Sequence, residues 1–141
     1  MIKLTRFPNP PKPDSALLAL RLIFGLSMAY LYGYSKLTTL LGDEKIEFMN
    51  FLWLGDTVSL ALVVFAEFFC SILLFFGLFT RLASVPLMFT MLVAVLYAHR
   101  SDPFSDKEHG LLYLGAYVVL FLMGPGRYSA DAWLSRKNTK A

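Results

Sequence analysis

The stretch Thr57–Thr80, TVSLALVVFAEFFCSILLFFGLFT, is an apolar run in which Glu67, its one acidic residue, lies near the middle. As a helix, a run of this length is long enough to cross the roughly 30 Å hydrocarbon core of a bilayer. A charge near the bilayer centre costs about 3 kcal/mol on insertion scales, so it is usually paired and buried between helices. The run therefore predicts a membrane-spanning helix whose central acid has a structural or functional role.

The composition of the chain predicts an integral membrane protein. Of its 141 residues, 57% are hydrophobic and only 16% are charged, whereas about 25% are charged in soluble domains. The net charge of +3 is explained by basic residues that sort to one side of the membrane, so no nucleic-acid partner is predicted. Because Cys70 is the single cysteine, an intrachain disulfide and thiol exchange by this chain alone are not expected.

Three further apolar stretches predict an all-α fold, a polytopic membrane protein built as a four-transmembrane-helix bundle with short interfacial segments. The fourth span has to begin near Asp106 to reach about 18 residues, or roughly 27 Å. The very short link before Leu82 predicts that the second and third spans form an antiparallel hairpin. Trp53, in the segment 42–56, is predicted to lie at the level of the lipid head groups. The predicted spans are residues 16–37, 57–80, 82–98 and 107–123.

The segments outside the spans predict the orientation. Residues 1–14 form a proline-rich arm, and residues 127–141 form a basic amphipathic tail, on either side of a membrane domain over residues 15–126. With four spans, the arm, the turn at Arg81 and the tail share one side, which holds eight Lys and Arg residues against four on the other. The positive-inside rule then places both termini in the cytoplasm.

Arg21 lies in the first span on the same helical face as three small residues. Arg21, Gly25, Ala29 and Gly33 recur every four residues, so they line up along one side of the helix. Small residues at this spacing let another helix approach closely, and we expect this face to contact a second copy of the chain or a protein partner. Arg21 is accordingly expected to point into the bundle. The alternative is that its side chain extends to the cytoplasmic surface.

Arg21 and Glu67 are together predicted to form a polar site inside the membrane. Scaling both helices to the thickness of the bilayer core places the two residues about 7 Å apart in depth, which two long side chains can span. One interpretation is a structural ion pair that fixes the packing of two helices. The other is a polar site for a proton, a quinone head group or a lipid carbonyl. The sequence leaves both open.

Residues of the third and fourth spans add weaker signals. His99 and His109 flank the loop between these spans, but two imidazoles with scattered carboxylates do not form a metal-ligand pattern, and no metal site is predicted. Tyr113 and Tyr117 lie one helical turn apart and can flank the flat ring of a ligand. The sequence contains no phosphate loop or nucleophile elbow, so no catalytic residue is assigned.

An ordered set of short motifs resembles the DoxX family, which consists of small four-helix bacterial membrane proteins. The matching motifs extend over nearly the whole chain in the expected order. The residues that the resemblance transfers to this chain, without a fixed role for any of them, are Arg21, Glu67, Arg81, Arg127 and Asp131. The motifs are RLIFG at 21–25, GYSK at 33–36, Glu67, GLFTR at 77–81, DPF at 102–104, HGLLY at 109–113 and GPGRYSAD at 124–131.

The resemblance implies a protein of the bacterial inner membrane that acts as an accessory subunit of a quinone-linked redox system. The family takes its name from a membrane subunit associated with thiosulfate:quinone oxidoreductase, so a quinone is the cofactor to expect. Whether the chain is itself an enzyme stays open. The alternative is a non-enzymatic scaffold or anchor of a larger envelope complex, with Arg21 and Glu67 as a structural ion pair. Both functions imply a lipid bilayer and a second copy or another membrane protein as partners.

Overall fold

The computed structural model describes residues 13–140, and every regular element within them is a helix. The all-helical fold expected from the sequence is therefore confirmed for this part of the chain. Nearly all of the predicted proline-rich arm, residues 1–12, lies outside the described residues.

The first long helix, Pro13–Leu41, extends beyond the predicted end at residue 37. It continues because nothing interrupts it before Gly42, which takes an extended conformation with φ −76° and ψ 163°. Lys36 consequently lies within the helix and not at its end. The helix contains two π-helical turns, a feature that often occurs at functional sites. Its parts are α1 (Pro13–Leu20), η1 (Arg21–Gly25), η2 (Met28–Gly33) and α2 (Tyr34–Leu41).

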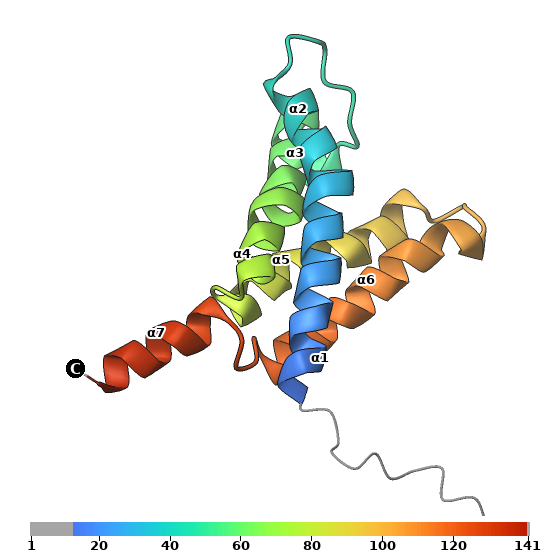
Figure 1. Ribbon diagram of the computed structural model, residues 1–141. Coiled ribbons are helices and arrows are strands. Elements are labelled where there is room, and N and C mark those ends of the chain that lie inside the picture. Colours follow the sequence, from blue (N-terminus) through green and yellow to red (C-terminus); the bar gives the residue numbers. More distant parts are fainter. Residues whose placement is uncertain (1–12, 141) are drawn as a thin grey trace, which may run out of the picture.

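The second and third long helices, Asp56–Phe76 and Thr80–Ala98, are joined by the predicted tight turn, and the third is inclined to the second (Figure 1). The second helix ends before the predicted Thr80, because Gly77 takes a left-handed conformation with φ 72° that commonly terminates helices. Its parts are α3 (Asp56–Val64), the π-helical turn η4 (Phe65–Cys70) and α4 (Ser71–Phe76). Those of the third are α5 (Thr80–Val93) and the π-helical turn η5 (Ala94–Ala98).

Two further helices complete the described chain. Helix α6 (Phe104–Met123) has 20 residues and begins slightly earlier than predicted, and α7 (Ala130–Thr139) forms the tail. The segment before the second long helix contains one short 3₁₀ turn, η3 (Phe51–Trp53), in which Leu52 and Trp53 have positive φ angles of 53° and 62°. Trp53 is 94% exposed, which suits the predicted contact with lipid head groups.

Three of the helices in residues 13–140 are long and apolar enough to cross a membrane, and they are the three long helices described above. Helix α6 is not among them, because its first turns carry Asp106, Lys107 and Glu108. Large apolar side chains such as Phe65, Phe76 and others cover the outer surface, which is the arrangement expected where lipid replaces water. The chain is therefore a multi-pass helical membrane protein, with three of the four predicted spans supported.

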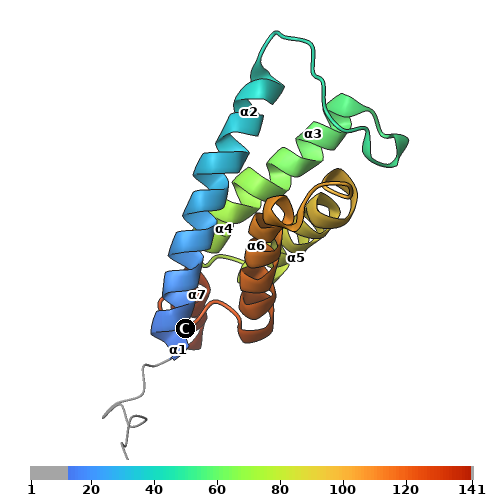
Figure 2. The same ribbon diagram turned by 90° about the vertical axis from the view of Figure 1, so that its right-hand side faces the viewer.

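The helices are arranged as two antiparallel pairs. The first long helix packs along the second, and α5 packs along α6 in a pair that is inclined to the first (Figures 1 and 2). The start of α1 and helix α7 lie at the same end of the bundle, while the α5–α6 turn lies away from that end (Figure 1). The residues that pack between the two pairs and are completely buried include Leu74, Leu87, Tyr117 and Leu120.

The small-residue face of the first long helix packs against the second long helix of the same chain. A Cβ atom on Gly33 would lie 2.6 Å from the backbone oxygen of Glu67, and one on Gly25 would lie 3.1 Å from the backbone of Phe75. Ala29, between them, is buried. Backbones approach this closely only across small residues. The expectation that this face binds a second copy or a partner is therefore wrong, because the chain covers the face itself.

Candidate functional site

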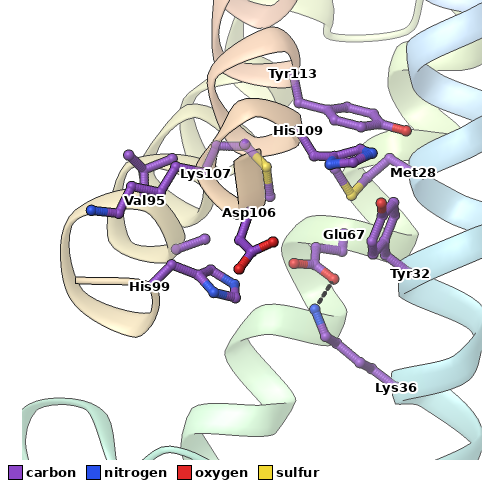
Figure 3. Close-up of a pocket in the computed structure, with 13 residues that line it drawn as sticks. Met28, Tyr32, Lys36, Glu67, Val95, His99, Asp106, Lys107, His109 and Tyr113 are labelled. Atoms are coloured by element: carbon purple, nitrogen blue, oxygen red, sulfur yellow. Dashed lines mark hydrogen bonds and ion pairs between the residues drawn. The ribbon is translucent and has the colours of Figure 1, made fainter. Parts of the chain in front are cut away.

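Glu67 forms an ion pair with Lys36 inside the bundle. Glu67 lies in the π-helical turn η4, and the ammonium group of Lys36 on α2 donates to its Oε2 atom (Figure 3). The Glu67 side chain is 4% exposed, whereas that of Lys36 is 30% exposed. The buried carboxylate thus has a partner that still reaches the surface of the bundle, so the pair combines a fixed anion with an accessible cation.

The predicted pairing of Arg21 with Glu67 is wrong. Gly33 lies against Glu67 and Gly25 against Phe75, so the two helices run antiparallel in a fixed register. Arg21 lies one turn before Gly25 on the first helix, and so beyond the level of Phe75. This is about 12 residues, or 18 Å along the helix axis, from the level of Glu67. The expected separation of about 7 Å came from scaling each helix to the bilayer independently. Side-chain length cannot close the actual distance.

Arg21 instead fastens the opposite end of the bundle. It is 1% exposed, so the interpretation that it points into the bundle is confirmed over extension to the surface. Its guanidinium donates to the backbone carbonyl of Tyr128. A Cβ on Gly77 would lie 2.0 Å from the Nη1 atom of Arg21, so glycine leaves the room that the guanidinium fills. Arg21 therefore joins the first long helix to the segment between α6 and α7.

The other motif residues also lie at this end. Asp131 accepts hydrogen bonds from the backbone N–H groups of Phe79 at 2.8 Å and Thr80 at 3.1 Å, which caps the start of α5. Arg81 donates to the Leu122 carbonyl at 3.4 Å. The backbone N–H of Arg127 donates to Asp14 at 2.9 Å. These contacts fix helix ends and connect the tail to the bundle, and they lie apart from Glu67.

A polar cavity of about 220 Å³ lies beside the ion pair, between the first long helix, η4, the third long helix and the start of α6 (Figure 3). Lys36 and Glu67 form part of its wall, and the carboxylate of Asp106 points toward the space between Glu67 and His99 (Figure 3). Its lining residues are Met28, Tyr32, Lys36, Glu67, Met91, Ala94, Val95, His99, Asp106, Lys107, His109, Gly110 and Tyr113.

An apolar groove of about 560 Å³ lies on the other side of the same ion pair. It extends between the second and third long helices beneath the segment that precedes α3. Lys36, Glu67, Ala94 and His99 line both the groove and the polar cavity, so the ion pair marks the place where the two spaces meet. The other residues that line the groove are Phe48, Met49, Phe51, Leu52, Leu54, Ser59, Leu62, Val63, Phe65, Ala66, Pro86, Phe89, Thr90, Val93 and Ala98.

The two histidines lie in the polar cavity without forming a metal site. The Nδ1 atom of His99 lies 2.7 Å from the Oδ2 atom of Asp102, and His109 lies on the first turns of α6. Among residues 13–140, no group of three or more His, Cys, Asp or Glu side chains is arranged to hold a metal ion. The structure also shows where the two histidines lie: both imidazoles line the same cavity as Glu67.

Tyr113 and Tyr117 do not form a slot for a flat ring. Their ring centroids are 6.0 Å apart and the rings are tilted by 43°. Tyr117 is completely buried, and its hydroxyl lies 3.4 Å from the Phe24 carbonyl. Tyr113 does line the polar cavity, where its hydroxyl donates to Ser27 at 2.9 Å and its ring meets Tyr32 edge-on. The two tyrosines that line the cavity are therefore Tyr32 and Tyr113.

Lys36 is the residue of this site that sequence reasoning missed. The predicted span ends at residue 37, which places Lys36 at its far end, among the four basic residues on the side away from the termini. A signal was present, because Lys36 follows Gly33 by three residues and so continues the face formed by the small residues. That face lies against Glu67. Extending the spacing by one step would have identified the partner of the acid.

These features define a multi-pass helical membrane protein with an ion pair between an apolar groove and a polar cavity. The comparisons with known proteins agree with this class. The chain belongs to the DoxX family, whose family model, described as DoxX, matches residues 16–100. It is also similar to "Inner membrane protein YqjF" of Escherichia coli (strain K12), with 28% identity over 112 residues that cover 74% of this chain and 82% of the relative. No solved structure matches the chain.

Proposed function

We propose that this DoxX-family protein binds an amphipathic molecule of the isoprenoid-quinone class and serves as an accessory subunit of a quinone-linked redox system in the inner membrane. The observation that carries the proposal is the position of the Lys36–Glu67 ion pair where the apolar groove meets the polar cavity. A molecule with an apolar tail and a polar head group fits these two surfaces. The pair takes the place of the Arg21/Glu67 site expected from the sequence.

The ion pair supplies both kinds of hydrogen bond that such a head group needs. A quinone presents carbonyl oxygens that accept hydrogen bonds, and a quinol presents hydroxyl groups that donate them. The Lys36 ammonium has three donors, of which one is used on Glu67. The Glu67 carboxylate has acceptor positions beyond the one that Lys36 occupies. One site can therefore hold both states of the same molecule.

The groove matches the apolar part of such a ligand in size and position. Its volume of about 560 Å³ falls within the range of roughly 300–1,000 Å³ that is common for small-molecule sites. Two residues of its wall, Leu62 and Phe89, are more than half exposed on the outside of the bundle. A lipophilic molecule can then enter sideways from the bilayer, and its tail can extend into lipid.

We further propose that α6 is the fourth span and that both termini are cytoplasmic. The charged first turns of α6 border the polar cavity, which gives these charges a polar surrounding within the bundle. The start of α1 and helix α7 share one end of the bundle (Figure 1), and that end carries Arg127, Arg136 and Lys137, as the positive-inside rule requires. The name of the Escherichia coli relative supports the inner membrane as the location. The proposed division is a membrane domain over residues 15–126 and a tail over 127–141.

One observation favours the alternative, a scaffold in which the ion pair is purely structural. Glu67 already has a charged partner in Lys36, and a buried acid that is paired in this way needs no ligand to be stable. Under this alternative, a second membrane protein is the partner and the groove is filled by bulk lipid. The two functions differ in whether a specific molecule remains bound after extraction.

Mass spectrometry of the gently extracted protein tests the proposal. The small molecules that co-purify are compared for wild type, Glu67→Gln and Glu108→Gln, the last being a matched change at an exposed acid of α6. A quinone that is retained by wild type and Glu108→Gln but reduced in Glu67→Gln supports the proposed function. If quinone is added during purification and none of the three proteins retains it above the level of bulk lipid, the scaffold becomes the better account.

A further inference from the structure

The polar cavity connects the buried Glu67 carboxylate with the outside of the bundle. Asp106 and His109, on the first turns of α6, are exposed, whereas Met28 and Met91 close the opposite wall and are buried. Glu67 itself is buried and forms part of the wall of this space. The cavity thus leads from the α5–α6 end of the bundle to the acid (Figure 3).

The size and lining of the cavity suit water. A water molecule occupies roughly 30 Å³ in the liquid, so a cavity of about 220 Å³ holds several. Water remains in a cavity only where polar groups bind it, and here such groups come from each of the helices that surround Glu67. The charged or titratable residues of the cavity wall are Tyr32 and Lys36 from the first long helix, His99 from the end of the third, and Asp106, Lys107, His109 and Tyr113 from α6. The Lys107 ammonium points away from Glu67 and donates to the Arg100 carbonyl (Figure 3).

We propose that the polar cavity is a water-filled proton route that joins Glu67 to the aqueous phase at the α5–α6 end, with Asp106 as the group at its entrance. Protons move rapidly along water and between carboxylate and imidazole groups, and this cavity supplies all three. The route ends at the ion pair, where the groove begins. The proposal rests on the proposed function in that the route ends beside the proposed head-group site at Lys36 and Glu67.

The route gives the site a sidedness. The α5–α6 turn lies away from the end that holds the start of α1 and helix α7 (Figure 1). At that other end, Arg21 and Tyr128 close the bundle, and the buried side chains of the core are mostly apolar, apart from Ser71, Thr80 and Ser84. The proposed route therefore reaches Glu67 from the side that faces away from both termini.

Thiol labelling tests whether the cavity holds water. Single cysteines are placed at Leu92, Ala94 and Leu96 in a Cys70→Ala background and treated with a charged, membrane-impermeant methanethiosulfonate. The reagent attacks thiolates, which form in water and not in lipid. Leu92 and Leu96 are exposed on the outside of the bundle, at 44% and 64%, whereas Ala94 lines the cavity.

We expect the cysteine at position 94 to react several-fold faster than those at positions 92 and 96, because only position 94 lines the cavity. Depth in the membrane alone would instead give labelling rates that decrease steadily from position 96 to position 92. A steady decrease, or uniformly slow labelling, overturns the proposal. Gel filtration in detergent checks that each variant is folded. If Ala94→Cys does not fold, Val95→Cys, at an adjacent position of the cavity wall, is read against the same two controls.

Infrared spectroscopy tests the proton route itself. The carboxyl band of Glu67 is the band that appears in wild type on acidification and is missing in Glu67→Gln. On transfer to D₂O, we expect this band to shift within the mixing time in wild type and in Glu108→Gln, and several-fold more slowly in Asp106→Asn. Slow exchange in wild type, or the same rate in Asp106→Asn as in wild type, overturns the route. Neither experiment uses a ligand. A dry cavity would therefore contradict the proton route, whereas a failure to retain a quinone would contradict the proposed function.

Discussion

Lys36 and Glu67 form an ion pair between the first and second long helices in which the acid is almost completely buried and the base remains 30% exposed. This asymmetry arises from the helix register. Gly33 brings the first helix into contact with the backbone of Glu67, and Lys36, one turn further on, reaches back to the carboxylate. The same pair borders both the groove and the cavity, so helix packing and the candidate site depend on one contact.

Replacing Lys36 should destabilise the protein because it leaves a buried acid without its partner. We expect Lys36→Met to cost about 1–3 kcal/mol, the range for a buried polar group that loses its hydrogen bond. Because Lys36 is partly exposed, we expect the loss of stability to lie toward the lower end of this range. The double variant Lys36→Met/Glu67→Gln should recover part of the loss, since contacting residues do not behave additively. Thermal unfolding in detergent measures all three proteins, and equal stability of Lys36→Met and wild type would contradict the structural importance of the pair.

Adding a methyl group at Gly33 should separate the first two helices. The new Cβ would lie 2.6 Å from the backbone oxygen of Glu67, and such overpacking typically costs about 1–3 kcal/mol. Gly115 provides the matched control, because a Cβ there meets no atom within 4 Å. Gly115→Ala should be neutral or stabilising by up to about 1 kcal/mol from helix propensity. If the two variants unfold at the same temperature, the first two helices do not pack as described.

Removing the carboxylate of Asp131 should loosen the connection between α7 and the bundle. Asp131 caps the first turn of α5 by accepting from Phe79 and Thr80, and loss of a cap typically costs about 1 kcal/mol. Asp131→Ala should therefore lower the unfolding temperature and increase the rate at which trypsin cleaves at Arg136 and Lys137. Asp131→Asn keeps one acceptor oxygen and should have a smaller effect. Unchanged proteolysis in Asp131→Ala would mean that the tail is held by other contacts.

If the groove holds the proposed quinone, filling it should displace that molecule without changing the ion pair. Val93 lines the groove, whereas its neighbour Leu92 does not and is exposed on the outer surface. We expect Val93→Trp to retain several-fold less quinone than wild type, and Leu92→Trp to retain the wild-type amount. The measurement is quantitative mass spectrometry of lipids extracted from the purified proteins. Equal retention by both variants would place the bound molecule outside the groove.

Much of the fold could be predicted from the sequence because the signals for membrane helices lie in short stretches of neighbouring residues. The long apolar runs, the turn near Gly77 and the small residues from Gly25 to Gly33 each require information from neighbouring positions alone. The burial of Arg21 also followed from its place on the small-residue face. The helix ends differed from the predicted ones where a glycine terminates the helix. The first long helix ends at Leu41, before Gly42, and the second ends at Phe76, before Gly77.

The candidate site was predicted only in part. Glu67 was identified because an acid within an apolar span has few explanations other than a structural or functional role. Its partner was not, because the neighbouring helix carries two bases, Arg21 and Lys36, and hydropathy alone does not give the register between the helices. Asp106 and the two histidines belong to segments that are distant in the sequence from Glu67. The inclination of the α5–α6 pair brings them into one cavity, and no local pattern specifies such an angle.

The sequence by itself determined that this chain is helical, that it resides in a membrane, and that one acid lies deep within it. These properties follow from hydropathy and residue spacing along single helices. The tertiary structure decided that Glu67 pairs with Lys36 while Arg21 binds the Tyr128 carbonyl at the other end. The physical reason is register: two antiparallel helices pack where their backbones approach most closely, and that contact, between Gly33 and Glu67, places Lys36 and not Arg21 beside the acid.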